Sequence, residues 1–249
     1  MTVRQSRGVE SDFAGKTCSA PVERSARMCE LVVRHVPQDR AIELLDVGSG
    51  TGSLVFLLAR ALPLASLAGI DVSAANIREA EARRCTLEMS LAARVRFEQG
   101  DYLQRAPCAV DGLTSDGVLH LLSGDTRALF AKLAADIRPG GVLVIDMPYD
   151  CAYNYAFAML RRILRLLRSR WLDAVILRVA RWVHGSQMSD EGLRERVPYM
   201  YLPPKRLAGR QLRNRIAPSV GLRFVTRYSN PSTSLSQLKH EVLVFEKVA

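Results

Sequence analysis

The sequence lacks the features of a secreted, disulfide-bonded or metal-binding protein. Its five cysteines are far apart in the chain, so no pair has the close spacing of a zinc site, and their odd number argues against a complete disulfide framework. The cysteines are Cys18, Cys29, Cys85, Cys108 and Cys151. Residues Met1–Lys16 are polar and contain no continuous apolar core of the kind that a secretion signal needs. We therefore predict a cytoplasmic protein with reduced thiols and no metal site.

Acidic residues are too few to balance the basic ones. The formal net charge of +10 could attract nucleic acid, an acidic membrane surface or an anionic substrate. The excess is uneven, because Arg161–Arg181 contains seven arginines and a single acid, Asp173. The charge is therefore a property of one region of the chain.

Apolar runs are short and alternate with helix-like stretches, which argues for a parallel sheet covered by helices. The strands that we expect are Ile42–Val47, Leu67–Val72, Arg94–Glu98, Val110–Thr114, Val142–Met147, Leu222–Tyr228 and His240–Lys247. The expected helices are Ala26–Val36, Ser53–Leu62, Ala74–Arg84, Thr126–Ile137 and one near Lys205–Ala217. Ser73 is placed to cap the third of these helices.

The most informative segment is a glycine-rich turn after the first strand, Asp46-Val47-Gly48-Ser49-Gly50-Thr51-Gly52-Ser53. Glycines let the backbone approach a ligand and tolerate positive φ, and the following helix directs free N–H groups toward that ligand. Nicotinamide and flavin enzymes use a similar turn, so the turn alone is weak evidence. Ser53 stands where their fingerprint has its third glycine, and Asp46 precedes the turn.

Further segments follow in a fixed order. Asp71 ends the second strand, Gly100-Asp101-Tyr102 follows the third, Ser115–His120 closes the fourth, and Ile137–Val144 contains a Pro-Gly-Gly turn into the fifth. Together with the glycine-rich turn, these motifs resemble the class I S-adenosylmethionine-dependent methyltransferases. Each motif alone is moderately specific for this family, but the motifs together, in this order and at this spacing, are a specific signature of it. The resemblance covers residues 42–147 and the closing strand pair.

The resemblance implies an α/β fold with a doubly wound, mostly parallel seven-stranded sheet, an antiparallel last strand and a helical cap inserted after strand five. We expect an N-terminal helical flap at 1–37 and a cofactor-binding core at 38–150. The cap insertion then covers 151–204, and the C-terminal part of the core sheet covers 205–249.

The resemblance also implies which residues hold S-adenosylmethionine. Asp71, beside Val72, takes the ribose diol, since a carboxylate can accept two strong hydrogen bonds from it. Asp101 accepts from the adenine amino group, and the Tyr102 amide faces a ring nitrogen.

By the resemblance, the glycine-rich turn itself binds the methionine part of the cofactor. Asp46 fixes the turn or reaches the cofactor ammonium, directly or through water. The remaining cofactor-binding residues are Gly48, Ser49, Gly50, Thr51 and Gly52. Asp116 contacts either the cofactor or the methyl acceptor.

Methyl transfer from a sulfonium is an in-line displacement with an already activated leaving group, so the protein mainly aligns the reactants and excludes water. A base is needed only when the nucleophile must lose a proton. His120, just after strand four, is the candidate base, although a packing role is open. Tyr149, Tyr153 and Tyr199 are candidate substrate contacts, and packing is the simpler interpretation of each.

The Asn-Pro-Pro-Tyr/Phe motif of many nucleic-acid amino-methylating enzymes is absent, and Ser115-Asp116-Gly117-Val118 occupies its place. We therefore expect a small acceptor, apolar or amphipathic, methylated at O, N or C. One alternative is an RNA methyltransferase, favoured by the basic charge. Another is a cofactor-binding protein without methyl transfer that acts as a partner or regulator. The oligomeric state is not indicated.

The arginine-rich insertion is helical and amphipathic. As one continuous helix, Tyr153–Val183 would be about 46 Å long, which exceeds the domain, so we expect a break near Ser169–Leu172. Arginines interrupt it too often for a membrane span. Three interpretations remain open: a lid with solvated arginines, a helix on an acidic membrane surface through Arg161–Arg181, or the wall of a pocket for a lipid-like acceptor.

Overall fold

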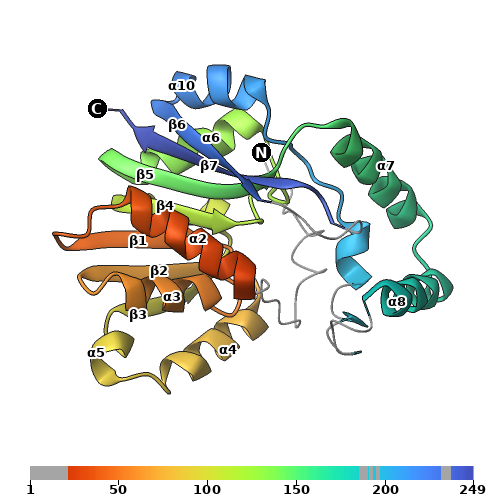
Figure 1. Cartoon of the computed structure of the whole chain (residues 1–249), viewed down its shortest axis with the longest axis horizontal. Coiled ribbons are helices and arrows are strands. Elements are labelled where there is room, and N and C mark those ends of the chain that lie inside the picture. The colour runs from red at the N-terminus through yellow and green to blue at the C-terminus, as the bar shows by residue number, and fades with distance from the viewer. Residues whose placement is uncertain (1–21, 185–189, 191–192, 195–196, 231–236, 249) are drawn as a thin grey trace, which may run out of the picture.

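One sheet of seven strands organises the chain (Figure 1). The computed structural model describes residues 22–184, 190, 193–194, 197–230 and 237–248. The strands are β1 (Ile42–Val47), β2 (Ala65–Asp71), β3 (Val95–Gln99), β4 (Val110–Asp116), β5 (Ile137–Pro148), β6 (Leu222–Asn230) and β7 (His240–Lys247). Their order is β3-β2-β1-β4-β5-β7-β6, and β7 runs antiparallel to both of its neighbours. The predicted fold class is confirmed.

Helices connect the strands and cover both faces of the sheet (Figure 1). The α-helices are α2 (Val22–His35), α3 (Ser53–Ala61), α4 (Ala74–Arg84), α5 (Met89–Ala92), α6 (Thr126–Ala135), α7 (Ala152–Leu166), α8 (Arg170–His184) and α10 (Ala217–Ser219). Two 3-10 turns, η1 (Tyr102–Gln104) and η2 (Val197–Tyr201), and one π-helical stretch, η3 (Leu212–Ile216), complete the described elements.

The core lies in two layers because successive strand residues point to opposite faces. On β1, Ile42 and Leu44 pack with α2 and α3, whereas Leu45 and Val47 pack with α6 and the η3–α10 segment. Both faces of β1 are therefore buried, as expected for a central parallel strand.

The N-terminal region contributes to this core. Met28 and Val32 of α2 are buried in the same cluster as α3 and β1. The part of the expected flap that lies in residues 1–21 is outside the described residues.

Most expected elements differ from the observed ones by a few residues at their boundaries, and the contacts of the chain explain two of these differences. The helix expected to reach Ile137 ends at Ala135, and β5 begins at Ile137, which pairs with Val110. A Cβ on Gly141 would lie 2.7 Å from the Asp111 carbonyl oxygen, so this glycine lets the start of β5 approach β4. The Pro-Gly-Gly segment is therefore part of the strand.

The helix expected from Lys205 begins later, because residues 205–208 run along the core instead. The Lys205 amide donates to the His120 carbonyl oxygen at 2.8 Å, and the Ala208 amide donates to the Pro148 carbonyl oxygen at 2.8 Å. These bonds fix the segment at the ends of β4 and β5.

Helices α7 and α8 stand apart from the layered core, at the right of the view in Figure 1. The predicted break between them is present, with α7 ending at Leu166 and α8 beginning at Arg170. Asn154 anchors the first turn of α7: its side-chain amide donates to the carbonyl oxygens of Tyr149 and Lys239 and accepts from the Lys239 amide. This buried residue ties the cap to the ends of β5 and β7.

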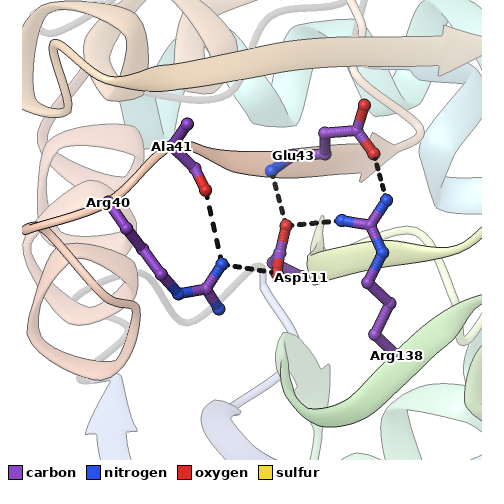
Figure 2. A network of polar contacts seen from close by, with 5 residues as sticks. All are labelled: Arg40, Ala41, Glu43, Asp111 and Arg138. Atoms are coloured by element: carbon purple, nitrogen blue, oxygen red, sulfur yellow. Dashed lines mark hydrogen bonds and ion pairs between the residues drawn. The ribbon is translucent and has the colours of Figure 1, made fainter.

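An ionic network joins the starts of β1, β4 and β5 (Figure 2). Asp111 accepts hydrogen bonds from Arg40, from the Glu43 amide and from Arg138, and Arg138 also donates to Glu43. Burial alone would raise the pKa of Asp111, but these donors outweigh it and lower the pKa. The network stabilises the amino-terminal edge of the sheet.

Candidate active site

The glycine-rich turn has a backbone that only glycine adopts easily. Gly48, Gly50 and Gly52 have φ values of 76°, 53° and 80°. A Cβ on Gly48 would lie 2.5 Å from Val118, and one on Gly52 would lie 2.5 Å from the Phe97 ring. The turn is therefore close to Val118, just after β4, and to Phe97 of β3, and a side chain at Gly48 or Gly52 would displace it.

Asp71, at the end of β2, holds this turn against α4. Its Oδ2 accepts from the Gly50 amide at 2.9 Å, and its Oδ1 accepts from the Ser73 amide at 2.8 Å and from Asn76 Nδ2 at 3.2 Å. An ionised carboxylate has about four acceptor positions, so three bonds leave one. A ligand diol that donates two hydrogen bonds to Asp71 must replace one of the existing donors.

The α4 side supports the turn as well. Ser73 caps α4 as predicted, accepting from the Asn76 amide at 3.3 Å. From the last turn of α4, Arg83 donates to the Thr51 carbonyl oxygen at 2.8 Å and lies over the Phe56 ring. Arg83 was not expected from the sequence, where it looks like an ordinary exposed helix residue.

Asp46 lies buried beneath the turn. Its Oδ1 accepts from the Thr114 hydroxyl at 2.9 Å. Burial raises the pKa of Asp46 to about 7; the Thr114 hydrogen bond opposes this, and the carboxylates of Asp116 and Asp71 add to it. Two other acids from the motifs, Asp116 and Asp71, therefore lie close enough to affect the ionisation of Asp46.

The adenine-side motif lies at the neighbouring strand end. The Gly100 amide donates to the Asp71 carbonyl oxygen at 3.0 Å, and Asp101 caps η1 by accepting from the Leu103 amide at 2.9 Å. The Tyr102 side chain points into the core, where its hydroxyl donates to Asp136 at 2.8 Å. Tyr102 thus presents only its backbone to this edge, the group that the sequence analysis assigned to the cofactor.

A second group of charged side chains lies at the ends of β4 and β5. Asp116 and Asp146 are directly opposite each other in the register of these strands. Arg24 of α2 joins them, with Nε 2.6 Å from Asp116 Oδ1 and 3.4 Å from Asp146 Oδ2. Burial raises the pKa of Asp116 despite Arg24, so this carboxyl gains protons more readily than an exposed one.

Two histidines adjoin this acidic pair. His240 Nδ1, at the start of β7, lies 3.2 Å from Asp146 Oδ2, and the His240 ring is perpendicular to that of His120 with centroids 5.5 Å apart. Burial alone would raise the pKa of Asp146, but His240 and Arg24 outweigh it and lower the pKa. Burial, His240 and Arg161 hold the pKa of His120 well below its usual value, so His120 is neutral at neutral pH.

The three candidate tyrosines do not form one group. Tyr149 follows β5 and pairs with Ala208 in a short parallel bridge. Tyr153 stacks on Phe157 within α7, with Lys239 over its ring. Tyr199 is partly buried in η2.

The comparisons with known proteins agree with this geometry. A methyltransferase-domain family model matches residues 45–143. A trans-aconitate 2-methyltransferase from Deinococcus radiodurans is 35% identical over 113 residues, which are 45% of this chain and 40% of that protein. One from Paracidovorax citrulli is 33% identical over 156 residues, 61% of this chain and 55% of that protein. The chain spans about half the length of the curated relatives it matches.

Residues 45–143 of this chain thus match a methyltransferase domain, and the relatives and the fold are those of class I S-adenosylmethionine-dependent methyltransferases. The solved structure of geranyl diphosphate C-methyltransferase from Streptomyces coelicolor A3(2), in complex with Mg2+, geranyl diphosphate and S-adenosyl-L-homocysteine, has a TM-score of 0.56 and 14% identity. The match covers 90% of this chain and 79% of that chain, and at this identity it shows the shared fold. The resemblance stated from the motifs is confirmed.

The residues present fit the cofactor of this methyltransferase family. The hydroxyl of Ser49 is buried in the turn without a hydrogen-bond partner among the described residues, which suits a polar ligand there. The glycines leave room for a ligand against the backbone, and Asp71 and Asp101 supply acceptors for hydroxyl and amino groups. Among the described residues, no group of three or more His, Cys, Asp or Glu is arranged to hold a metal ion.

The sequence analysis missed Arg24, Asp146 and His240. One signal pointed to Asp146, because it is the only charged residue in the expected strand Val142–Met147. Arg24 and His240 gave no local signal, since their partners lie far away in the chain.

Replacing Asp46 by Asn is expected to stabilise the cofactor-free protein above pH 7 and to weaken binding of S-adenosylhomocysteine. The folded-state pKa of about 7 lies above the unfolded value, so the carboxyl costs stability progressively as the pH rises toward 7. An amide that keeps the Thr114 hydrogen bond removes this cost, roughly 1–4 kcal/mol. Thermal unfolding at pH 4.5 and pH 8, with calorimetric titration of the ligand, measures both effects. If Asp46→Asn changed the stability equally at pH 4.5 and pH 8, the raised pKa of Asp46 would be contradicted.

Proposed function

We propose that this chain transfers the methyl group of S-adenosylmethionine to an O, N or C atom of a small apolar or amphipathic acceptor. The observation that carries the proposal is the juxtaposition at one sheet edge of the glycine-rich turn, held by Asp71, and the Asp116–Asp146–histidine group. Doubly wound α/β proteins bind ligands at the carboxyl ends of their strands, which is where both groups lie.

Each residue then has a defined task. S-adenosylmethionine supplies the methyl group on a sulfonium, whose positive charge already activates the leaving group. Asp71 and Val72 bind the ribose side, and Asp101 with the Tyr102 amide binds the adenine side. Asp46 and the turn residues Gly48 to Gly52 hold the methionine part. Asp116, fixed by Arg24, faces the reacting end.

The cap at 151–204 and the tyrosines Tyr149, Tyr153 and Tyr199 complete the acceptor side in this proposal. Support comes from Asn154, which fixes the start of α7 directly at the ends of β5 and β7. A closed acceptor site excludes water and aligns the nucleophile with the methyl group, which is the main contribution that a protein makes to this reaction.

The acceptor class can be identified directly. Protein and methyl-labelled S-adenosylmethionine are incubated with small-molecule, lipid and RNA fractions, and with trans-aconitate because of the names of the curated relatives. Label in a small-molecule or lipid fraction supports the proposal, and label in RNA supports the alternative RNA methyltransferase. Tight cofactor binding without label in any fraction supports a partner or regulator without methyl transfer.

Asp71→Ala is expected to weaken binding of S-adenosylhomocysteine about 100-fold, because two charge-assisted hydrogen bonds are lost. Calorimetric titration measures the dissociation constant. Asp111→Ala is the matched control: it removes an equally well-bonded aspartate at the other edge of the sheet, so it should lower the melting temperature and leave ligand affinity unchanged. Wild-type affinity in Asp71→Ala would refute the ribose assignment.

For an acceptor that must lose a proton, His120→Gln is expected to lower kcat about 100-fold while cofactor affinity is unchanged. Because its pKa lies well below the usual value, His120 stays neutral as the pH falls from 8 to 6, so protonation of His120 should not lower kcat over this range. His240→Gln tests the adjacent imidazole, and His35→Gln, on α2 with its ring bonded to Tyr228, is the control. Full activity of His120→Gln would leave His120 a packing role.

A second candidate function is peripheral binding of the cap to acidic membranes from the cytoplasmic side. Large apolar side chains on α7 and α8 are exposed, notably Leu166, Trp171 and Trp182 at 85%, 73% and 88%. Exposed arginines accompany them at positions 162, 165, 168, 170 and 178. Apolar contacts flanked by arginines suit an interface with anionic lipid. No helix among the described residues is long and apolar enough to cross a bilayer.

The double variant Trp171→Ala/Trp182→Ala is expected to lose cosedimentation with phosphatidylserine-containing vesicles. Pure phosphatidylcholine vesicles should bind the wild type weakly, and added salt should reduce binding to the acidic ones. Met89→Ala/Val225→Ala removes exposed apolar side chains elsewhere on the surface and serves as the control. Equal binding of the wild type to both kinds of vesicle would contradict the lipid proposal.

A further inference from the structure

Buried polar atoms that lack a hydrogen-bond partner are concentrated in one place among the described residues. Four of them are one oxygen of Asp116, one oxygen of Asp146, His120 Nδ1 and Arg161 Nε, and beside them His240 Nδ1 lies 3.2 Å from the other Asp146 oxygen. Buried polar groups in folded proteins are almost always hydrogen-bonded, so such a concentration indicates a site for a polar ligand. Four of these residues lie at the ends of β4, β5 and β7, and Arg161 comes from the cap helix α7.

Arg161 is a buried cation without an anionic partner in the described part of the chain. Its side chain donates to the Leu202 carbonyl oxygen at 3.1 Å and lies over the Phe157 ring, and its Nε has no partner. Burial lowers its pKa to about 10, so it remains charged at neutral pH. A buried charge without a counter-charge destabilises the folded protein in general.

Two other arginines use more of their donors than Arg161 does, although one of them, buried Arg206, also has an Nε without a partner among the described residues. Arg24 bridges two carboxylates. Arg206 donates to two carbonyl oxygens, those of Leu119 and Gly124, and so holds the loop after β4. Arg161 has most of its donors unused, which leaves an edge of the guanidinium for a ligand.

Arg161 is close to the acceptor side of the site. Its charge lowers the pKa of His120. Its acceptor, Leu202, lies in the same segment as Lys205, whose amide donates to the His120 carbonyl oxygen. Arg161 therefore places a positive charge, and Phe157 an aromatic ring, on the cap side of His120.

We propose that Arg161 binds a carboxylate of the methyl acceptor. The inference rests on the proposed function, since it assigns the acceptor of that site. A guanidinium offers two parallel N–H groups that match the two oxygens of a carboxylate. The nearby Asp116 and Asp146 disfavour a dianion such as a phosphate monoester, so a singly charged group fits best. An acceptor with one carboxylate end and an apolar body uses both the cation and its surroundings.

The test measures acceptor binding separately from cofactor binding. Protein saturated with S-adenosylhomocysteine is titrated calorimetrically with short- and medium-chain carboxylic acids, with their neutral methyl esters and with the corresponding alkyl phosphates. Wild type should bind some of the carboxylates, and Arg161→Gln should bind these at least about tenfold more weakly while the weak binding of the esters is unchanged. Arg162→Gln, the exposed neighbour on the same helix, should behave as wild type.

Arg161→Lys keeps the charge and the folded core but not the two-pronged geometry, and should give an intermediate loss of carboxylate affinity. It replaces Arg161→Gln as the test variant should the latter fail to fold. Carboxylate affinity equal to wild type in both variants, tighter binding of phosphates, or failure of every carboxylate to bind the wild type would overturn the proposal. Absence of S-adenosylhomocysteine binding by the wild type would instead refute the proposed function.

Discussion

The hydrogen bond from the Gly50 amide to Asp71 connects the two halves of the proposed cofactor site. Gly50 belongs to the turn after β1, and Asp71 ends β2 and also receives the Ser73 amide and the Asn76 side chain at the start of α4. One carboxylate therefore sets the position of a loop and of a helix. The turn can adopt its conformation only because its glycines reach positive φ, and Asp71 keeps it there in the absence of a ligand.

Negative charge gathers along this edge of the sheet, and its distribution matches the cofactor. Burial raises the pKa of Asp46, and the carboxylates of Asp116 and Asp71 raise it further. S-adenosylmethionine carries a sulfonium and an ammonium, so its binding relieves that repulsion. Further along the same edge, Arg24 and His240 offset the pair Asp116 and Asp146, and Arg161 introduces positive charge on the cap side. Acidic side chains thus lie near the turn, and positively charged ones accompany them toward the cap.

Local signals predicted the elements that carry the cofactor. The expected bounds of β1 and α4 agree with the structure at both ends, because an apolar run ending in Gly48 and a capping Ser73 specify them within a few residues. The boundaries of β5 and of the helix expected at Lys205–Ala217 were predicted wrongly because contacts between residues far apart in the chain set them. Gly141 allows β5 to start early beside β4, and hydrogen bonds to His120 and Pro148 hold residues 205–208 out of the following helix.

The same distinction explains the site residues. The motif residues lie on neighbouring strand ends, so their proximity follows from the fold class. Arg24, however, reaches Asp116 across 92 positions of sequence, and His240 reaches Asp146 only because the antiparallel β7 starts where β5 ends. Such pairs depend on how α2 packs and on the direction of β7. No short sequence pattern encodes either feature.

The two ends of β4 show how one strand serves stability and chemistry separately. Asp111, at its start, has both oxygens bonded to two arginines and a backbone amide, and its pKa is lowered (Figure 2). Asp116, at its other end, is buried with one oxygen lacking a hydrogen-bond partner among the described residues, and its pKa is raised. The Asp111 carboxylate, with both oxygens bonded, holds three strands together. An incompletely bonded one costs stability, and a ligand that supplies the missing bond or charge recovers that cost on binding.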